Sequence, residues 1–142
     1  MGKEHLARDQ EEKVNELHWE IQQWKSNFRF IDDEIMFITH LLDSYIFEPN
    51  TPNLFERLQN YKARLKKLKS TKAKLQSQIS IQENNLGGML ECTENTSDLE
   101  YCNKHEKLQT LVDDCISKFQ ELKSEIFNYA GGILKKRKPN GH

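Results

Sequence analysis

The chain has 142 residues, of which 30% are charged and 36% hydrophobic, with only six glycines and three prolines. This composition is typical of long amphipathic helices and argues against a sheet protein. Its 21 basic and 22 acidic side chains give a net charge of −1, so the chain as a whole carries no excess charge that would draw it to nucleic acid.

The first predicted element is one long helix over about residues 4–47. Apolar residues recur there in alternating steps of three and four, which places them along one face of a helix. This stripe consists of Val14, Leu17, Ile21, Trp24, Phe28, Ile31, Ile35, Ile38, Leu42 and Tyr45. The sequence Pro49-Asn50-Thr51-Pro52 ends the helix, because a residue before proline is pushed out of the helical region.

The second predicted helix covers about residues 52–90, with Thr51 as its N-cap and Pro52 as its first helical residue. Its stripe contains polar residues at two positions, Lys72 and Gln82. The stripe consists of Leu54, Leu58, Tyr61, Leu65, Leu68, Lys72, Leu75, Ile79, Gln82, Leu86 and Met89. We expect Gly87-Gly88 to weaken or end this helix.

The third predicted helix covers about residues 98–134. It begins at a capping box formed by Ser97 and Glu100. Its stripe consists of Tyr101, His105, Leu108, Val112, Cys115, Phe119, Leu122, Ile126, Tyr129 and Ile133. The basic residues 135–142 are predicted to form a disordered tail. Residues 1–134 then constitute a single domain.

Short connections make neighbouring helices antiparallel, so the expected fold is all-α, an elongated up-down-up bundle of three helices with a coiled-coil heptad core. The charges favour this hairpin. Residues 1–50 carry five basic and eleven acidic side chains, whereas residues 51–90 carry eight basic and two acidic ones. A turn near residue 50 places residues 62–74 opposite residues 27–39, and opposite charges beside the stripes select this pairing.

The first helix carries more apolar residues than its stripe requires. The surplus residues form a candidate interface: Trp19, Phe30, Met36, Phe37, Leu41 and Phe47. One interpretation is that they cover the junction with the third helix. The other is an exposed patch that binds another protein, most simply a second copy of the chain. The second interpretation predicts a non-enzymatic interaction or scaffold module that forms homo-oligomers.

An alternative function is suggested by basic residues on the second helix: Lys62, Arg64, Lys66, Lys67, Lys69 and Lys74. Together with the Lys-rich tail they could bind nucleic acid phosphates. The competing interpretation is a solvated helix face, partly paired with the acidic first helix. Because only Tyr61 adjoins this run, no platform for base stacking is evident.

Candidate chemistry is sparse. Cys92, Cys102 and His105 lie around the second turn, but zinc requires four ligands and the spacing matches no zinc module. No catalytic, phosphate-binding or cofactor motif is present in the sequence, so we expect no enzyme activity, no metal, no cofactor and no small-molecule substrate. Three cysteines without a signal peptide or membrane span indicate reduced thiols in the cytoplasm, with no membrane contact.

Overall fold

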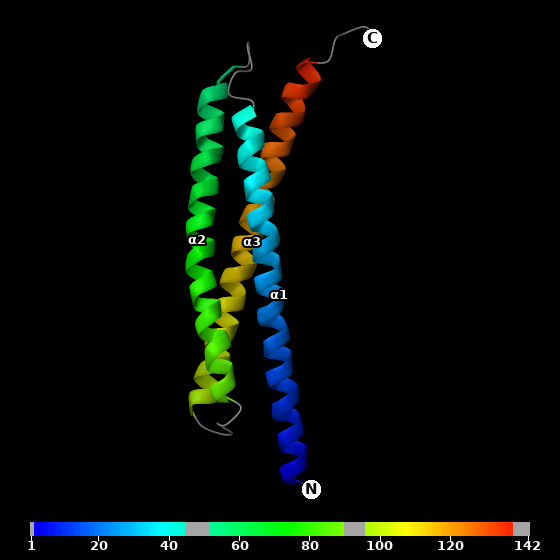
Figure 1. The fold of residues 1–142 in the computed structure, drawn as a ribbon, viewed down its shortest axis with the longest axis vertical. Coiled ribbons are helices and arrows are strands. Elements are labelled where there is room, and N and C mark those ends of the chain that lie inside the picture. The colour runs from blue at the N-terminus through cyan, green and yellow to red at the C-terminus, as the bar shows by residue number, and fades with distance from the viewer. Residues whose placement is uncertain (1, 45–51, 90–95, 138–142) are drawn as a thin grey trace.

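The computed structural model describes the backbone of residues 2–44, 52–89 and 96–137, and the side chains of residues 11–44, 52–87 and 98–133. It contains helices α1 (Gly2–Ser44), α2 (Leu54–Met89) and α3 (Thr96–Arg137). The three helices run in alternating directions, as Figure 1 shows. This confirms the all-α bundle of three helices packed up-down.

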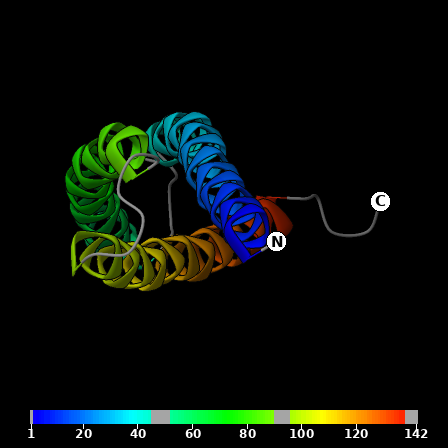
Figure 2. The ribbon, with the colours of Figure 1, turned by 90° about the horizontal axis from the view of Figure 1, so that it is seen from below.

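The helices do not pack against each other equally. The contact between α2 and α3 is the most extensive, the contact between α1 and α2 is smaller, and the contact between α1 and α3 is the smallest. In Figure 1 α1 and α3 cross and separate at both ends, and the start of α1 extends past the end of the α2–α3 hairpin. Seen along the long axis, the three helices form the sides of a triangle (Figure 2). The flank of α1 beside α3 is therefore partly uncovered.

The predicted apolar stripes form the core. Every described member of the α1 stripe is buried, and the largest fully buried side chains include Phe28, Ile21 and Phe119. Leu68 of α2 and Tyr129 of α3 are only partly buried, and Ala130 is buried beside Tyr129. The side chains of Tyr45 and Met89 lie outside the described residues. Full burial of each large aliphatic or aromatic side chain contributes about 1.5–3 kcal/mol, so these stripes supply most of the stability.

The helix ends differ from the predicted ends by a few residues. α2 begins at Leu54, because Pro52 and Asn53 form a turn. Asn53 has a φ of 58°, in the left-handed region that asparagine tolerates better than most residues. Its carbonyl accepts a hydrogen bond from the backbone N–H of Arg57 at 3.0 Å. Thr51 lies outside the described residues.

At the other ends, helical structure extends through glycine pairs, including Gly87-Gly88, which was expected to weaken or end α2. α2 continues past Gly87 to Met89, and α3 passes through Gly131 and Gly132 to Arg137. Buried Leu86 and Ile133 anchor these turns to the core, and such tertiary burial outweighs the low helix propensity of glycine. The tail predicted from residue 135 therefore starts as helix, and residues 138–142 are outside the described part.

Three polar side chains are buried among the described residues: Lys72, Gln82 and His105. Gln82 pairs with α3, because the Tyr101 hydroxyl donates a hydrogen bond to the Gln82 carbonyl at 2.9 Å and Gln82 Nε2 donates to the Tyr101 carbonyl at 3.5 Å. Burial raises the pKa of Tyr101 to about 12. A buried phenol that donates a hydrogen bond strongly favours its neutral form.

Opposite charges connect α1 and α2 at three levels: two pairs join an acidic α1 residue to a basic α2 residue, as the charge segregation predicted, and the third has the reverse polarity. Lys72 pairs with Asp32, Lys62 Nζ lies 2.7 Å from Asp43, and Lys25 Nζ lies 3.1 Å from Glu83. The Lys62–Asp43 pair shows that the register is shifted by about one turn from the predicted pairing of residues 62–74 with residues 27–39. The shift is consistent with α2 starting at Leu54.

The Glu83 carboxylate is the best hydrogen-bonded of these groups. Lys25 and Gln22 both donate to it, at 3.1 and 2.8 Å. The hydrogen bond from Lys25 is the main cause that lowers the pKa of Glu83, partly opposed by its burial. These contacts hold the middle of α1 against the last third of α2.

Candidate protein-interaction surface

The predicted interface residues of α1 divide into exposed and partly buried groups. Trp19, Phe30, Met36 and Phe37 each leave 60–63% of their surface exposed. Leu41 is partly buried and packs against the core. Phe47 lies outside the described residues. Four large apolar side chains on one helix are thus left in contact with solvent.

Helix geometry assigns these exposed residues to two directions. Trp19, Phe30 and Phe37 are separated by eleven and seven residues, which at about 100° per residue places them within roughly 20° of one line. Met36 lies about 100° away from Phe37 on the same basis. The predicted interface residues therefore do not all share one side of α1: the three aromatic residues do, and Met36 lies on another side.

Helix α3 adds an aromatic residue that the sequence did not single out. The rings of Phe37 and Phe127 lie 6.5 Å apart, and Phe127 is 39% exposed. Lys123 Nζ lies 2.5 Å from Glu34 and 5.8 Å from the centre of the Phe127 ring, so charge and cation–π contacts hold the two helices together there. Phe127 follows Ile126 of the stripe in the sequence. Heptad spacing alone does not tell whether a residue at such a position contacts another helix or only water.

We call Phe30, Phe37 and Phe127 the aromatic patch. Aromatic side chains each present roughly 150–250 Å², so at the observed exposures the patch leaves roughly 300 Å² of apolar surface in water. That area is comparable to the largest apolar patches of soluble monomers, which are often functional. A stable interface requires about 800 Å² from each partner, so the patch could form only the centre of one.

A polar cluster fixes α3 against α1 nearer the other end of the bundle. His105 Nε2 lies 2.6 Å from Glu20 Oε2, and the Trp24 and His105 ring centres are 4.6 Å apart. The indole N–H of Trp24 donates to Gln109 at 3.1 Å. Because a carboxylate is only an acceptor, Nε2 carries the proton. The stripes predicted burial of Trp24 and His105, but gave no signal for Glu20.

The basic residues of α2 do not form one continuous face. Lys62 is paired with Asp43 and Arg64 with Glu125. Within the described part of the chain no ion pair is present at Lys66, Lys67, Lys69 or Lys74. At about 100° per residue, Lys67 and Lys74 share a side of α2, whereas Lys66 and Lys69 point elsewhere. The predicted phosphate-binding run is thus partly neutralised and divided.

Neither of the two described cysteines belongs to a metal or disulfide site. Cys102 and Cys115 are free thiols, the latter buried in the core, and burial raises the pKa of Cys115. Cys92 lies outside the described residues, so the predicted cluster of Cys92, Cys102 and His105 is not described. Among the side chains that are described, no group of three or more metal-ligating residues is present.

Comparisons with known proteins give no relative from which a function could be taken. No family model, curated protein sequence or solved structure matches the chain. Within the described ranges, no helix is both long enough and apolar enough to cross a bilayer. The chain is therefore placed by its architecture alone, as an all-α bundle of three helices with an exposed aromatic patch between α1 and α3.

Proposed function

We propose that the protein is a non-enzymatic, coiled-coil-type interaction module that binds a second copy of itself through the aromatic patch. The observation that carries the proposal is the roughly 60% exposure of both Phe30 and Phe37 on one side of α1, with the Phe37 ring 6.5 Å from that of Phe127. Exposed aromatic rings lose unfavourable contact with water when another apolar surface covers them, and aromatic residues are enriched in the cores of interfaces.

The geometry also favours a symmetric dimer. The Phe37 and Phe127 rings contact each other across the small contact area between α1 and α3, and both stay partly exposed, so a helix of another molecule can reach this side of both helices. In a two-fold dimer the same patch is used twice, so one set of residues suffices for both partners. The Phe127 ring contacts both Phe37 and Lys123. These contacts restrict the motion of the Phe37 and Phe127 rings before association, so less conformational entropy is lost on binding.

Size-exclusion chromatography with light scattering tests the proposal. We expect the native chain to have twice its 16.8 kDa monomer mass, and the variant Phe30→Glu/Phe37→Glu to have the monomer mass with unchanged helical circular dichroism. The matched control is Phe55→Glu, because Phe55 is 68% exposed but lies at the start of α2. Monomers for all three proteins at tens of micromolar would contradict self-association.

The alternative of nucleic acid binding has weaker support. Lys62 and Arg64 are already in ion pairs, and the remaining lysines of α2 are divided between sides of the helix. Nucleic acid binding requires several phosphate contacts, and its affinity falls steeply with salt. An oligonucleotide that binds in 50 mM salt and is released in 200 mM salt would restore this alternative.

A further inference from the structure

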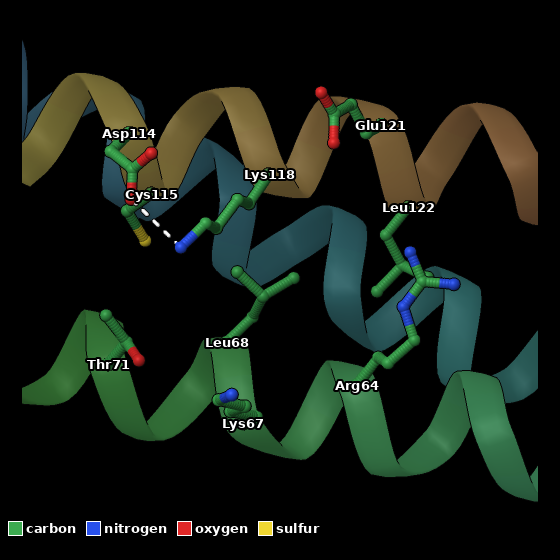
Figure 3. A pocket seen from close by; sticks show the side chains of 9 residues that line it. All are labelled: Arg64, Lys67, Leu68, Thr71, Asp114, Cys115, Lys118, Glu121 and Leu122. Atoms are coloured by element: carbon green, nitrogen blue, oxygen red, sulfur yellow. Dashed lines mark ion pairs between the residues drawn. The ribbon is translucent and has the colours of Figure 1, made fainter.

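A second surface, separate from the aromatic patch, follows the groove between α2 and α3. It contains two cavities of about 250 and 270 Å³. One lies between Arg64 on α2 and Leu122 on α3, and the other lies further along, between Gln82 and Lys104. In the close view of the first cavity, α1 runs behind the two helices (Figure 3). From Arg64 to Gln82 the groove extends about 27 Å at 1.5 Å per residue.

The floor of this groove is apolar, and part of it is exposed. Leu68, Cys115 and Leu122 line the first cavity, and Figure 3 shows Leu68 between the two helices. Ile81 and Leu111 line the second cavity and are 58% and 49% exposed. A groove of this kind between two antiparallel helices is the surface on which a further amphipathic helix docks.

The rim of the groove is mainly basic. The residues that line the two cavities include five basic side chains against two acidic ones, Asp114 and Glu121. The basic ones are Arg64, Lys67, Lys104, Lys107 and Lys118, and of these Arg64 pairs with Glu125, which lines neither cavity. Lys118 Nζ lies 3.1 Å from Asp114, and both side chains are more than half exposed, so this pair holds little energy and leaves the rim positive.

From the apolar floor, the length and the charge of the rim, we infer that the α2–α3 groove binds an acidic amphipathic helix of a partner protein. Leu, Ile or Met side chains of that helix would cover Ile81 and Leu111, and its carboxylates would face Lys67, Lys107 and the other rim lysines. Both cavities are open to solvent, whereas small-molecule sites enclose most of their ligand. The floor offers phosphates no partner, so a peptide fits better than nucleic acid.

A designed peptide tests the inference without knowledge of the natural partner. The probe is an 18-residue fluorescein-labelled helix with Leu at heptad positions a and d and Glu at the flanking positions, titrated with the full chain by fluorescence anisotropy. A second peptide carries Lys in place of each Glu. We expect micromolar binding of the acidic peptide and at least tenfold weaker binding of the basic one.

Two charge-reversed variants locate the site. Lys67→Glu/Lys107→Glu alters one rim residue at each cavity and should weaken binding of the acidic peptide at least tenfold. Lys66→Glu/Lys69→Glu changes the net charge equally, but these two exposed residues line neither cavity, and the expected change is less than threefold. Ile81→Asn should also weaken binding at least fivefold, which bulk electrostatics would not explain.

Several results would overturn the inference. One is the absence of binding by the acidic peptide at millimolar protein. A second is an equal loss of peptide affinity in Lys67→Glu/Lys107→Glu and Lys66→Glu/Lys69→Glu. A third is an oligonucleotide that binds through Lys67 and Lys107 while the acidic peptide does not bind. A dimer that Lys67→Glu/Lys107→Glu converts to monomer would assign the groove to a second copy of the chain. Phe30→Glu/Phe37→Glu should leave peptide binding unchanged, so this inference and the proposed dimer can fail separately.

Discussion

The buried lysine of α2 gives the sharpest test of how the bundle is held in register. Lys72 occupies a stripe position and is only 5% exposed, yet it pairs with Asp32 of α1. Its ammonium also lies 5.9 Å from the centre of the Phe28 ring. The perturbation is Asp32→Asn, which removes the negative partner, keeps the shape of the side chain and leaves the ammonium buried.

The expected magnitude follows from the burial of the two partners. Removal of one member of a fully buried ion pair costs about 3–5 kcal/mol, because an uncompensated charge remains. The Asp32 side chain is 46% exposed, so water also solvates the pair and the loss is smaller. We expect Asp32→Asn to lower the free energy of unfolding by about 1–2 kcal/mol. The matched control is Asp33→Asn, an exposed neighbour, which should change it by less than about 0.5 kcal/mol.

The partner substitution, Lys72→Met, should act in the opposite direction. Methionine fills a similar volume without the desolvation penalty of the ammonium, so stability should be unchanged or increase by about 1–2 kcal/mol. In the double variant, Asp32→Asn should then have almost no further effect, because the coupling between the two residues has been removed.

Urea unfolding followed by circular dichroism measures these differences without adding ionic denaturant. With a slope of about 2 kcal/mol per molar urea, Asp32→Asn should move the midpoint down by roughly 0.5–1 M. Equal midpoints for Asp32→Asn and Asp33→Asn would refute the reasoning. So would a loss of more than about 1 kcal/mol in Lys72→Met, since the ammonium would then be net stabilising.

Three further results are expected. The raised folded-state pKa of Tyr101 stabilises the fold below pH 10, and this stabilisation is lost as the pH rises towards 12. Between pH 9 and 12 the free energy of unfolding of the native chain should therefore fall by about 2 kcal/mol more than that of Tyr101→Phe. If urea titrations give the same pH dependence for both proteins, this expectation is contradicted. Iodoacetamide should alkylate half-buried Cys102 at least tenfold faster than Cys115, because the Cys115 thiol is buried and has a raised pKa. Mass spectrometry measures the two rates, which should become equal in denaturant. Gly132→Ala should raise stability by about 0.5 kcal/mol, since an added Cβ meets nothing within 4 Å and alanine favours helix; a lower melting temperature would contradict it.

The heptad spacing predicted the core well because burial on a helix depends on direction, and direction follows from sequence separation. Every described member of the α1 stripe is buried, and even Lys72, Gln82 and His105 are buried at their predicted positions. Leu68 is the exception at the groove. It is only partly buried, because one side of it faces the first cavity between α2 and α3.

The contacts between helix flanks could not be predicted in the same way. Glu20 beside His105 and Phe127 beside Phe37 depend on how closely α1 approaches α3 and on the angle at which they cross. The period of the apolar residues does not specify that angle, because the same stripes allow several crossing geometries. The sequence therefore indicated a surplus of apolar residues on α1, but not which α3 residue would extend the patch.

The segregation of charge along the chain separates the two proposed surfaces. Helix α1 pairs with one side of α2: Asp32 and Asp43 of α1 contact Lys72 and Lys62, and Lys25 of α1 contacts Glu83. On the α3 side of α2, Lys67 lines the groove together with lysines of α3, while the aromatic patch lies between α1 and α3. Because the two surfaces share no lining residue, their substitutions should act independently.

We therefore expect a chain with both Phe30→Glu/Phe37→Glu and Lys67→Glu/Lys107→Glu to combine the two effects without further change. It should be a monomer in light scattering and should bind the acidic peptide as weakly as the lysine variant alone. If the aromatic substitutions instead altered peptide affinity by more than about threefold, the two surfaces would be coupled. Dimer formation would then have to reshape the groove, most directly through α3, which contributes to both.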